Sequence, residues 1–233
     1  MIEISEVTKR YPGGHEALTN LSLNIEQGEL VFLTGHSGAG KSTLLKLIAA
    51  IERPTNGHVI VRGQNVGRLK RAALPFFRRN IGMIFQDHKL LYDRTVFDNV
   101  LLPLQIQGLT GSDAAKRVRA ALDKVGLLSK ERGRPITLSG GEQQRLCIAR
   151  AIVSRPALVL ADEPTANLDD AYARDIMDMF RAFNEVGVTL IISTHDHDLI
   201  RRYGGRSIQL AYGKYVGEQV DKHGHNQVKD HVA

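Results

Sequence analysis

Two stretches near the start of the chain, residues 2–8 and 21–25, alternate between apolar and polar side chains. A period of two is typical of a strand that buries one face. Residues 58–62 repeat the pattern after a turn at 53–57. Because no helical pattern separates the first two strands, they do not follow the order of a parallel sheet. We expect a small antiparallel sheet that lies against a larger core.

Other stretches are apolar almost throughout, which is typical of strands buried on both faces of a parallel sheet. They occupy residues 29–34, 80–85, 157–163 and 188–193. Helices are expected at 41–51 and 171–185, and short strands near 207–211 and 215–219. The sequence therefore predicts an α/β fold with a parallel-sheet core.

Between residues 95 and 154 the apolar positions are spaced three or four apart, which predicts helices inserted between strands of the core. We expect one domain over residues 1–220, with a catalytic core at about 1–86 and 155–220 and a helical subdomain at about 87–154. The polar residues 221–233 are expected to form a disordered tail, and metal binding by the tail's histidines is a weaker alternative.

The loop between the strand at 29–34 and the helix that follows matches the phosphate-binding pattern G-x-x-x-x-G-K-[ST]. Its residues are Gly35, His36, Ser37, Gly38, Ala39, Gly40, Lys41, Ser42 and Thr43. The glycines let successive backbone N–H groups turn toward one anion, Lys41 supplies charge for the β- and γ-phosphates, and Ser42 offers a hydroxyl to Mg²⁺. A strand-to-helix turn without a ligand is the alternative. The order of strand, loop and helix favours a P-loop nucleotide site.

Acidic and polar side chains follow three of the apolar strands. Asp162 and Glu163 end one run, and on a strand their side chains would point to opposite faces. We expect Asp162 to hold Mg²⁺ and Glu163 to polarise the attacking water. His195 is a candidate for contact with the γ-phosphate, and Gln86 for sensing Mg²⁺ and water. Each of the last two residues could also be an ordinary polar residue.

Residues 138–145 read Leu-Ser-Gly-Gly-Glu-Gln-Gln-Arg. Ser139 and Glu142 have the spacing of a helix capping box, and capping alone would explain this pair. Gly140 and Gly141, however, leave the backbone exposed at a helix N-terminus, which makes a second potential anion site. A head-to-tail dimer would let this loop of one copy close over the nucleotide of the other.

Composition adds limits on where the protein works. The 233 residues include one cysteine, Cys147, so no intrachain disulfide can form, and Cys147 is expected to be a small core residue. Apolar runs are far shorter than the ~20 residues that cross a bilayer, and the N-terminus does not resemble a signal peptide. The net charge is +6. The densest basic cluster is Arg68, Lys70, Arg71, Arg78 and Arg79. We interpret it as a solvated face, with phospholipid headgroups as the alternative partner.

Together these motifs resemble the ATP-binding-cassette (ABC) ATPases over about residues 2–220. The resemblance implies a Walker A loop at 35–43, a Q-loop at Gln86, a signature motif at 138–145, Walker B with the catalytic glutamate at 158–163, a D-loop at 167–169 that includes Asp169, and a switch histidine at His195. Tyr11 matches the adenine-stacking aromatic, although packing at a strand end would also explain it. The family implies ATP and Mg²⁺ as cofactors and a homodimer that sandwiches two ATP molecules. It also implies a groove around 86–107 for a helix of a membrane subunit, with Leu90, Leu91, Tyr92 and Phe97 as candidate contacts, although internal packing of the helical insertion would also explain these four residues.

Three stretches, residues 84–96, 167–170 and 183–189, are similar to the cell-division branch of this family. That resemblance implies an FtsX-like integral membrane subunit, a place at the cytoplasmic face of the bacterial inner membrane at the septum, and activation of cell-wall hydrolases. The closest alternative is the ATPase of a lipoprotein-release or MacB-like efflux complex. No nucleic-acid partner is expected, because the insertion between the Walker motifs is compact and holds a single cysteine. A nucleotide-binding scaffold that hydrolyses slowly is a further alternative. His36, Thr137 and Ala166 depart from common family choices, but none of them removes a catalytic group.

Overall fold

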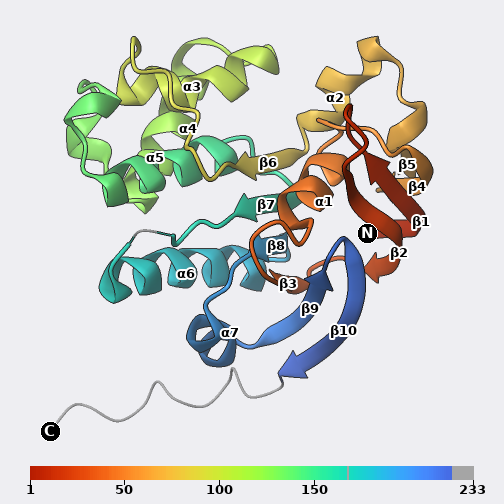
Figure 1. Cartoon of the computed structure of the whole chain (residues 1–233). Coiled ribbons are helices and arrows are strands. Elements are labelled where there is room, and N and C mark those ends of the chain that lie inside the picture. Colours follow the sequence, from red (N-terminus) through yellow and green to blue (C-terminus); the bar gives the residue numbers. More distant parts are fainter. Residues whose placement is uncertain (167, 222–233) are drawn as a thin grey trace, which may run out of the picture.

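The computed structural model describes residues 1–166 and 168–221. Residues 222–233 of the predicted tail and Asn167 of the predicted D-loop lie outside the described residues, whereas Asp221, expected in the tail, ends a strand. Figure 1 shows two sheets, with helices packed between and beneath them, and a separate group of helices to one side. None of the helices in the described ranges combines the length and apolarity that a bilayer crossing requires.

The larger sheet has the strand order β10-β9-β3-β8-β7-β6. Its strands are β3 (Leu30–Thr34), β6 (Ile81–Ile84), β7 (Leu158–Asp162), β8 (Thr189–Ser193), β9 (Gly205–Ala211) and β10 (Lys214–Asp221). All neighbouring pairs are parallel except β9 and β10, which form an antiparallel hairpin at one edge. Every residue of β7 and β8 is buried. This confirms the parallel core that the continuous apolar runs predict.

The smaller sheet is antiparallel, with the order β2-β1-β4-β5. It consists of β1 (Ile2–Arg10), β2 (Glu16–Ile25), β4 (Asn56–Val61) and β5 (Gln64–Asn65). β1 and β2 are longer than their alternation predicts. Register shifts interrupt their pairing, and Glu6 and Asn20 adopt φ values of 49° and 47°. At such an irregularity one strand carries an extra residue, which breaks the alternation of apolar and polar side chains. The alternation therefore predicts strands that are too short.

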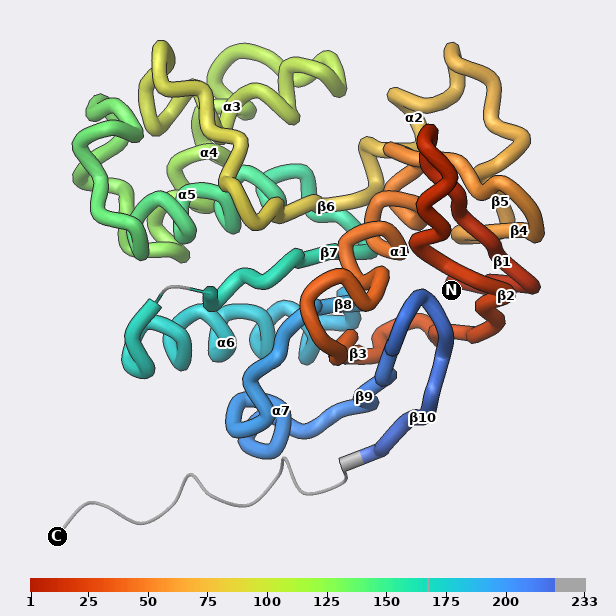
Figure 2. Tube along the Cα trace, in the orientation of Figure 1, coloured from red at the N-terminus to blue at the C-terminus, as the bar shows by residue number. Residues whose placement is uncertain are grey.

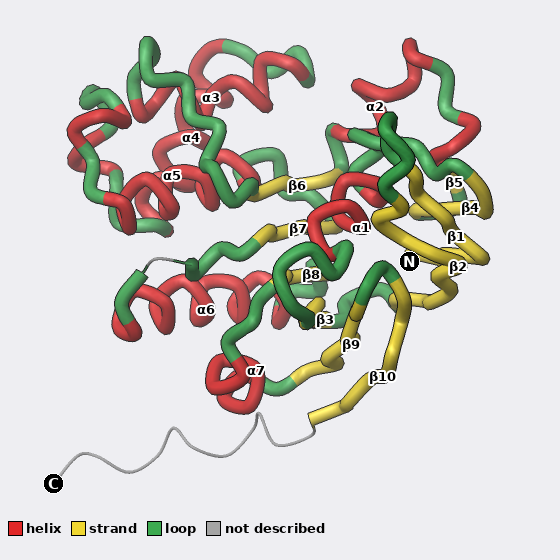
Figure 3. The backbone as a smooth tube through the Cα atoms, in the orientation of Figure 1, coloured by secondary structure: helices red, strands yellow, loops and turns green. Residues whose placement is uncertain are grey.

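A segment between β5 and β6 was not predicted from the sequence. It contains the 3₁₀ turns η1 (Val66–Arg68) and η2 (Arg71–Ala73) and the short helix α2 (Leu74–Arg78). The helix α1 (Lys41–Ile48) is three residues shorter than expected and packs between the two sheets. Its apolar side joins residues of both sheets in one buried cluster. The helices α6 (Asp170–Glu185) and α7 (His197–Tyr203) pack against each other (Figure 3).

The inserted helices are present between β6 and β7. They are α3 (Val96–Ile106), α4 (Gly111–Lys124) and α5 (Gly140–Ile152), with the 3₁₀ turns η3 (Leu128–Lys130) and η4 (Pro135–Thr137) before α5. β6 and β7 are parallel neighbours, so the chain leaves the sheet and returns beside the strand it left. In Figure 2 this group lies apart from the antiparallel sheet, and the backbone joins it to the core through β6 and β7.

Candidate active site

The phosphate-binding pattern folds into a loop that requires its glycines. Gly35, Gly38 and Gly40 have φ values of 137°, 79° and 104°, a region that favours glycine. A Cβ atom on Gly35 would lie 2.2 Å from the carbonyl oxygen of Leu210 on β9, and one on Gly40 would lie 2.7 Å from that of Ala17 on β2. Both sheets therefore approach the loop too closely for a side chain at these two positions.

Lys41 begins α1 and folds back across the loop. Its buried ammonium group donates to the carbonyl oxygens of Gly35 (2.7 Å) and His36 (3.3 Å). It also lies 3.6 Å from Oε1 of Glu163. The residue before the helix is Gly40, which has no side chain to cap the first turn. The helix N-terminus and the Lys41 cation thus present positive charge at one place, as an anion site needs.

The prediction that Asp162 and Glu163 are neighbouring residues of one strand was wrong. Their side chains nevertheless have different neighbours. β7 ends at Asp162, and Glu163 turns away with a φ of 48°. Asp162 is buried, and its Oδ1 accepts a hydrogen bond from the Ser193 hydroxyl at 2.7 Å. The same Ser193 oxygen accepts from the backbone N–H of Glu163 at 2.8 Å. Ser193, which the sequence did not single out, therefore fixes both acidic residues from the neighbouring strand.

His195 follows β8 and reaches the same place from a third strand. Its Nδ1 lies 3.0 Å from Oε2 of Glu163, so the two carboxylate oxygens of Glu163 face Lys41 and His195 separately. The histidine side chain is 74% exposed, whereas that of Glu163 is 14% exposed. The carboxyl ends of neighbouring parallel strands meet at this edge of the sheet, where such sheets place their ligands.

Two further predicted residues lie around this edge. Gln86 is exposed and follows β6, the strand next to β7. Tyr11 is half-buried at the end of β1, and its hydroxyl lies 3.5 Å from Oγ1 of Thr43. The Lys9 ammonium lies 4.8 Å from the centre of the Tyr11 ring. Tyr11 is therefore beside the phosphate-binding loop, where both the stacking and the packing interpretations place it.

The capping box predicted at Ser139 is confirmed. The Ser139 hydroxyl accepts from the N–H of Glu142 (3.3 Å), and the Glu142 carboxylate accepts from the N–H of Ser139 (3.0 Å). A hydrogen bond from Lys130 lowers the pKa of Glu142, and the backbone bond from Ser139 adds to this effect. A Cβ atom on Gly140 would meet no atom within 4 Å, so the space beside the backbone is open here. The Glu142 carboxylate therefore makes two contacts at the start of α5, one with the Ser139 backbone and one with the Lys130 ammonium group.

Within one chain, this loop and the phosphate-binding loop lie apart. The C-terminal end of α5 contacts β6, where a Cβ on Gly82 would meet the carbonyl oxygen of Ala151. The N-terminal end of α5 is therefore its outer end (Figure 1). Asp169 caps α6 by accepting from the N–H groups of Ala171 and Tyr172 at 3.1 and 3.0 Å. Capping is the role the structure gives Asp169 within one chain.

Residues 18–166 match the family described as ABC transporter. The chain belongs to the ABC transporter family. As an ABC cassette it binds ATP and has ATPase activity, the hydrolysis of ATP to ADP and phosphate. The cassette is 56% identical to the cell division ATP-binding protein FtsE of Escherichia coli, over 93% of this chain and 98% of that protein. It is 43% identical to FtsE of Bacillus subtilis, over 94% and 96% of the two chains.

Among solved structures, the cassette resembles MJ0796, a bacterial ABC transporter cassette described as a dimer. The TM-score is 0.89 at 37% identity, over 95% of this chain and 99% of that one. A second structure of MJ0796, a dimer in a post-hydrolysis state bound to ADP and Pi, has the same TM-score at 36% identity. These likenesses confirm the predicted P-loop fold with its antiparallel and helical parts.

Proposed function

We propose that this chain is the ATP-hydrolysing subunit of an FtsEX-like membrane complex that couples an ATP-driven dimer cycle to septal cell-wall hydrolysis. The observation that carries the proposal is the 56% identity to Escherichia coli FtsE across nearly all of both chains. The predicted catalytic residues are all present, and Lys41, Glu163 and His195 are in contact. That arrangement supports hydrolysis over a scaffold that only binds nucleotide.

ATP would lie across the loop of residues 35–43. The backbone N–H groups at Gly38 and Gly40 and the start of α1 would hold the phosphates, and Lys41 would neutralise the β- and γ-phosphates. Tyr11 borders the loop through Thr43 and would stack on the adenine. The buried Lys41 ammonium is already held by backbone carbonyls beside this loop. It therefore needs little reorganisation to meet a phosphate.

Mg²⁺ would be held by oxygen atoms of Ser42, Gln86 and Asp162. The described residues contain no cluster of three His, Cys, Asp or Glu side chains, so a metal here depends on hydroxyl and amide oxygens beside one carboxylate. This oxygen set fits Mg²⁺, which usually takes one or two carboxylates together with substrate phosphates. Ser193 orients Asp162 through one carboxylate oxygen. The ion would neutralise charge that develops on the phosphates.

Glu163 would act as the general base. Its carboxylate lies among the ends of three parallel strands, where it would polarise the attacking water and take its proton. The hydrogen bond that the Glu163 backbone N–H donates to the Ser193 hydroxyl, together with the left-handed turn, fixes where this carboxylate points. His195 would contact the γ-phosphate and, through its 3.0 Å contact, position Glu163.

The site would be completed by a second copy of the chain. Ser139, Gly140 and Gly141 form an open helix N-terminus at the outer end of α5, which suits a phosphate supplied by another protomer. Asp169 would lie at the same interface. ATP would then hold a homodimer together, and hydrolysis would release it. The dimers described for MJ0796 support this arrangement.

The membrane partner would be an FtsX-like subunit whose cytoplasmic helix enters the groove around residues 86–107. Of the candidate contacts, Tyr92 is 46% exposed, whereas Leu90 is 6% exposed and belongs to the core. Leu91 and Phe97 are half-buried. Tyr92 is therefore the strongest candidate contact, and Leu90 supports the groove from within. The complex would lie at the cytoplasmic face of the inner membrane at the septum.

A pull-down from membranes with the Glu163→Gln variant and ATP tests this function. The variant is expected to bind ATP, hydrolyse it far more slowly and retain an FtsX-like membrane protein. Lys41→Ala, which should weaken ATP binding itself, is the matched control. Wild-type turnover by Glu163→Gln would refute the general-base role.

Capture of a lipoprotein-release or efflux permease instead would favour the alternative complex. Depletion that leaves division normal but stalls lipoproteins would favour it too. A filter-binding assay that detects salt-dependent DNA affinity would contradict the expected absence of a nucleic-acid partner.

A further inference from the structure

The positive charge of this chain is concentrated in one acid-free segment. Residues 53–86 contain no Asp or Glu but seven Arg or Lys side chains, while the whole chain has a net charge of +6. The remainder of the chain is therefore close to neutral. None of the seven cations makes an ion pair with a described residue. Uncompensated charge of this kind attracts an anionic partner.

Three of the seven cations have structural roles. Arg53 donates to the carbonyl oxygens of Gly67 and Leu69, at 3.5 and 2.6 Å. Arg78 donates to those of Ala49 and Ala50 at the end of α1, and Arg79 donates to that of Ile106. These bonds fasten the segment between β5 and β6 to the core and to α3.

Of the four remaining cations, Arg62 lies in the turn between β4 and β5, and the other three extend from the segment between β5 and β6. Arg68, Lys70 and Arg71 are exposed, and their side chains make no hydrogen bond to the described part of the chain. A few residues further on, the apolar ring of Phe76 is 62% exposed. Arg68, Lys70, Arg71 and Phe76 are called the basic face below. Val66, Leu69, Leu74 and Phe77 anchor the same segment on the core.

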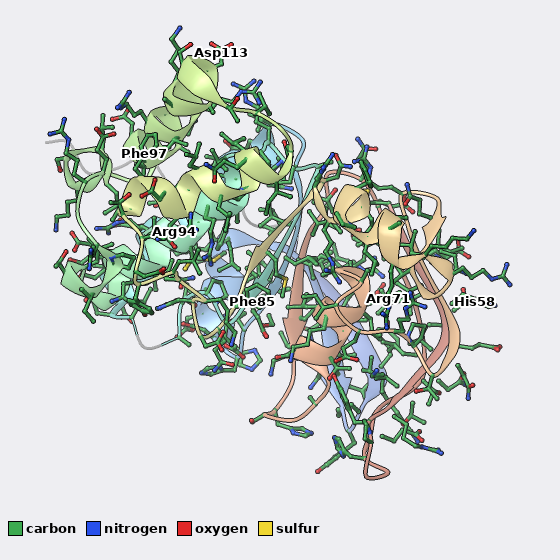
Figure 4. The ribbon with its side chains drawn as sticks, turned by 90° about the horizontal axis from the view of Figure 1, so that it is seen from above. His58, Arg71, Phe85, Arg94, Phe97 and Asp113 are labelled. Carbon is green, nitrogen blue, oxygen red and sulfur yellow. The ribbon has the colours of Figure 1, made fainter. Side chains whose placement is uncertain are left out.

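We propose that the basic face binds the surface of an anionic phospholipid bilayer. The inference rests on the proposed function, which places a membrane subunit at the groove around residues 86–107. α2 and α3 are joined at that side, because Arg79 donates to the carbonyl oxygen of Ile106 (2.8 Å) and Gln107 donates to that of Arg79 (3.2 Å). Figure 1 places α2 and α3 at the same upper side, and Figure 4 shows Arg71 and Phe97 from that direction.

The chemistry of the basic face favours lipid over other anions. Three cations within four residues, with an aromatic ring a few residues on, can contact headgroup phosphates and the acyl boundary together. No carboxylate within residues 53–86 would oppose that approach. Each Lys or Arg near an anionic bilayer strengthens binding about fivefold, so the three together account for about a hundredfold. The contact would orient the cassette beneath its membrane subunit.

Sedimentation of the full chain with phosphatidylcholine vesicles, with and without phosphatidylglycerol, tests the proposal. Binding is expected only with phosphatidylglycerol, and it should weaken with salt. The variant Arg68→Gln/Lys70→Gln/Arg71→Gln should lose about a hundredfold in affinity. Phe76→Ser should lose less. The control Lys124→Gln/Arg174→Gln/Lys214→Gln removes the same charge from exposed positions outside the segment and should bind as the wild type does.

Three results would overturn the proposal: no binding of the wild type to anionic vesicles at low salt, an equal loss in the control variant, or a basic face that binds a DNA duplex but no vesicle. ATPase activity measured on the same preparations shows whether the lipid-binding proposal alone has failed or the proposed function has failed as well. The basic-face variant should hydrolyse ATP at the wild-type rate, since its substitutions lie outside the nucleotide site. A chain without ATPase activity would count against the proposed function and leave the vesicle result to be judged separately.

Discussion

Arg150 is expected to hold in place the backbone that follows Gln86. Its guanidinium group donates from α5 to the carbonyl oxygens of His88 and Lys89, at 2.5 and 2.7 Å. The Cys147 thiol, one turn earlier, donates to the same His88 oxygen at 3.3 Å. His88 and Lys89 have φ values of 58° and 49°, which are strained for residues with a side chain. Arg150 is half-buried, and this burial lowers the pKa of its guanidinium group.

The size of the effect follows from these contacts. A hydrogen bond from a charged donor contributes about 1.5–3 kcal/mol when buried, and the bond to Lys89 is exposed and worth less. Arg150→Met should therefore lose about 3–4 kcal/mol of contacts. Relaxation of one of the two left-handed residues, His88 or Lys89, returns about 1–2 kcal/mol. The net loss of about 2 kcal/mol predicts a fall in melting temperature of about 4–8 °C for a domain of this size.

Thermal unfolding and hydrogen exchange measure the two parts of this prediction. Exchange should accelerate at residues 87–91 more than elsewhere in Arg150→Met, and ATPase activity should fall because Gln86 loses its support. Arg150→Lys keeps the charge but cannot donate in the same planar geometry, so it should recover less than half of the stability. A melting temperature within about 1 °C of the wild type, or unchanged exchange at 87–91, would refute the reasoning.

Three further predictions concern single residues. Gly35→Ala should abolish ATP binding because its Cβ would lie 2.2 Å from the Leu210 carbonyl oxygen. The Cβ of Gly38→Ala would meet no atom within 4 Å, so this variant should lose only about 1–2 kcal/mol of stability to backbone strain. Nucleotide titration and thermal unfolding compare the two variants. Burial raises the pKa of Cys147 to about 12, so a thiol reagent at pH 8 should label the native chain far more slowly than the urea-unfolded chain; equal rates would contradict the buried position. The pKa of Glu142 is lowered from 4.5 in the folded chain, so its carboxylate stabilises the fold above pH 4.5 and loses this effect as pH falls through the lower folded pKa. Unfolding curves from pH 7 to pH 3 should therefore show a smaller loss of stability in acid for Glu142→Gln than for the wild type.

Much of the fold could be predicted because buried strands and one-sided strands carry different patterns. The apolar runs at β7 and β8 identify the parallel core, and the alternation in β1 identifies the antiparallel sheet. The segment between β5 and β6 could not be predicted. Its apolar anchors follow two 3₁₀ turns and a short helix, so no single period relates them. The place of β9 beside β3 depends on pairing between residues far apart in sequence.

The candidate site was predictable in residue type but not in geometry. The motif identifies Lys41 and the apolar run identifies Asp162, because phosphate and Mg²⁺ require these side chains. The left-handed turn at Glu163 has no such signal, since the preceding strand pattern suggests that the strand continues. Ser193 is one polar residue at the end of an apolar strand, and its contact with Asp162 appears only once β8 lies beside β7 in register.

Lys41 connects nucleotide binding to the proposed general base. Its ammonium group lies 3.6 Å from Glu163, so this carboxylate competes with a bound phosphate for the same cation. Glu163→Gln removes the competitor as well as the base, and both changes should lengthen the time that ATP stays bound. A non-hydrolysable ATP analogue separates the two causes, because hydrolysis does not affect its affinity. If competition contributes, the variant should bind the analogue up to about fivefold more tightly than the wild type, which corresponds to about 1 kcal/mol for a pair at this distance. Equal affinities for the analogue would mean that Lys41 reaches the phosphates without giving up its contact with Glu163, and that slow hydrolysis alone retains ATP in the variant.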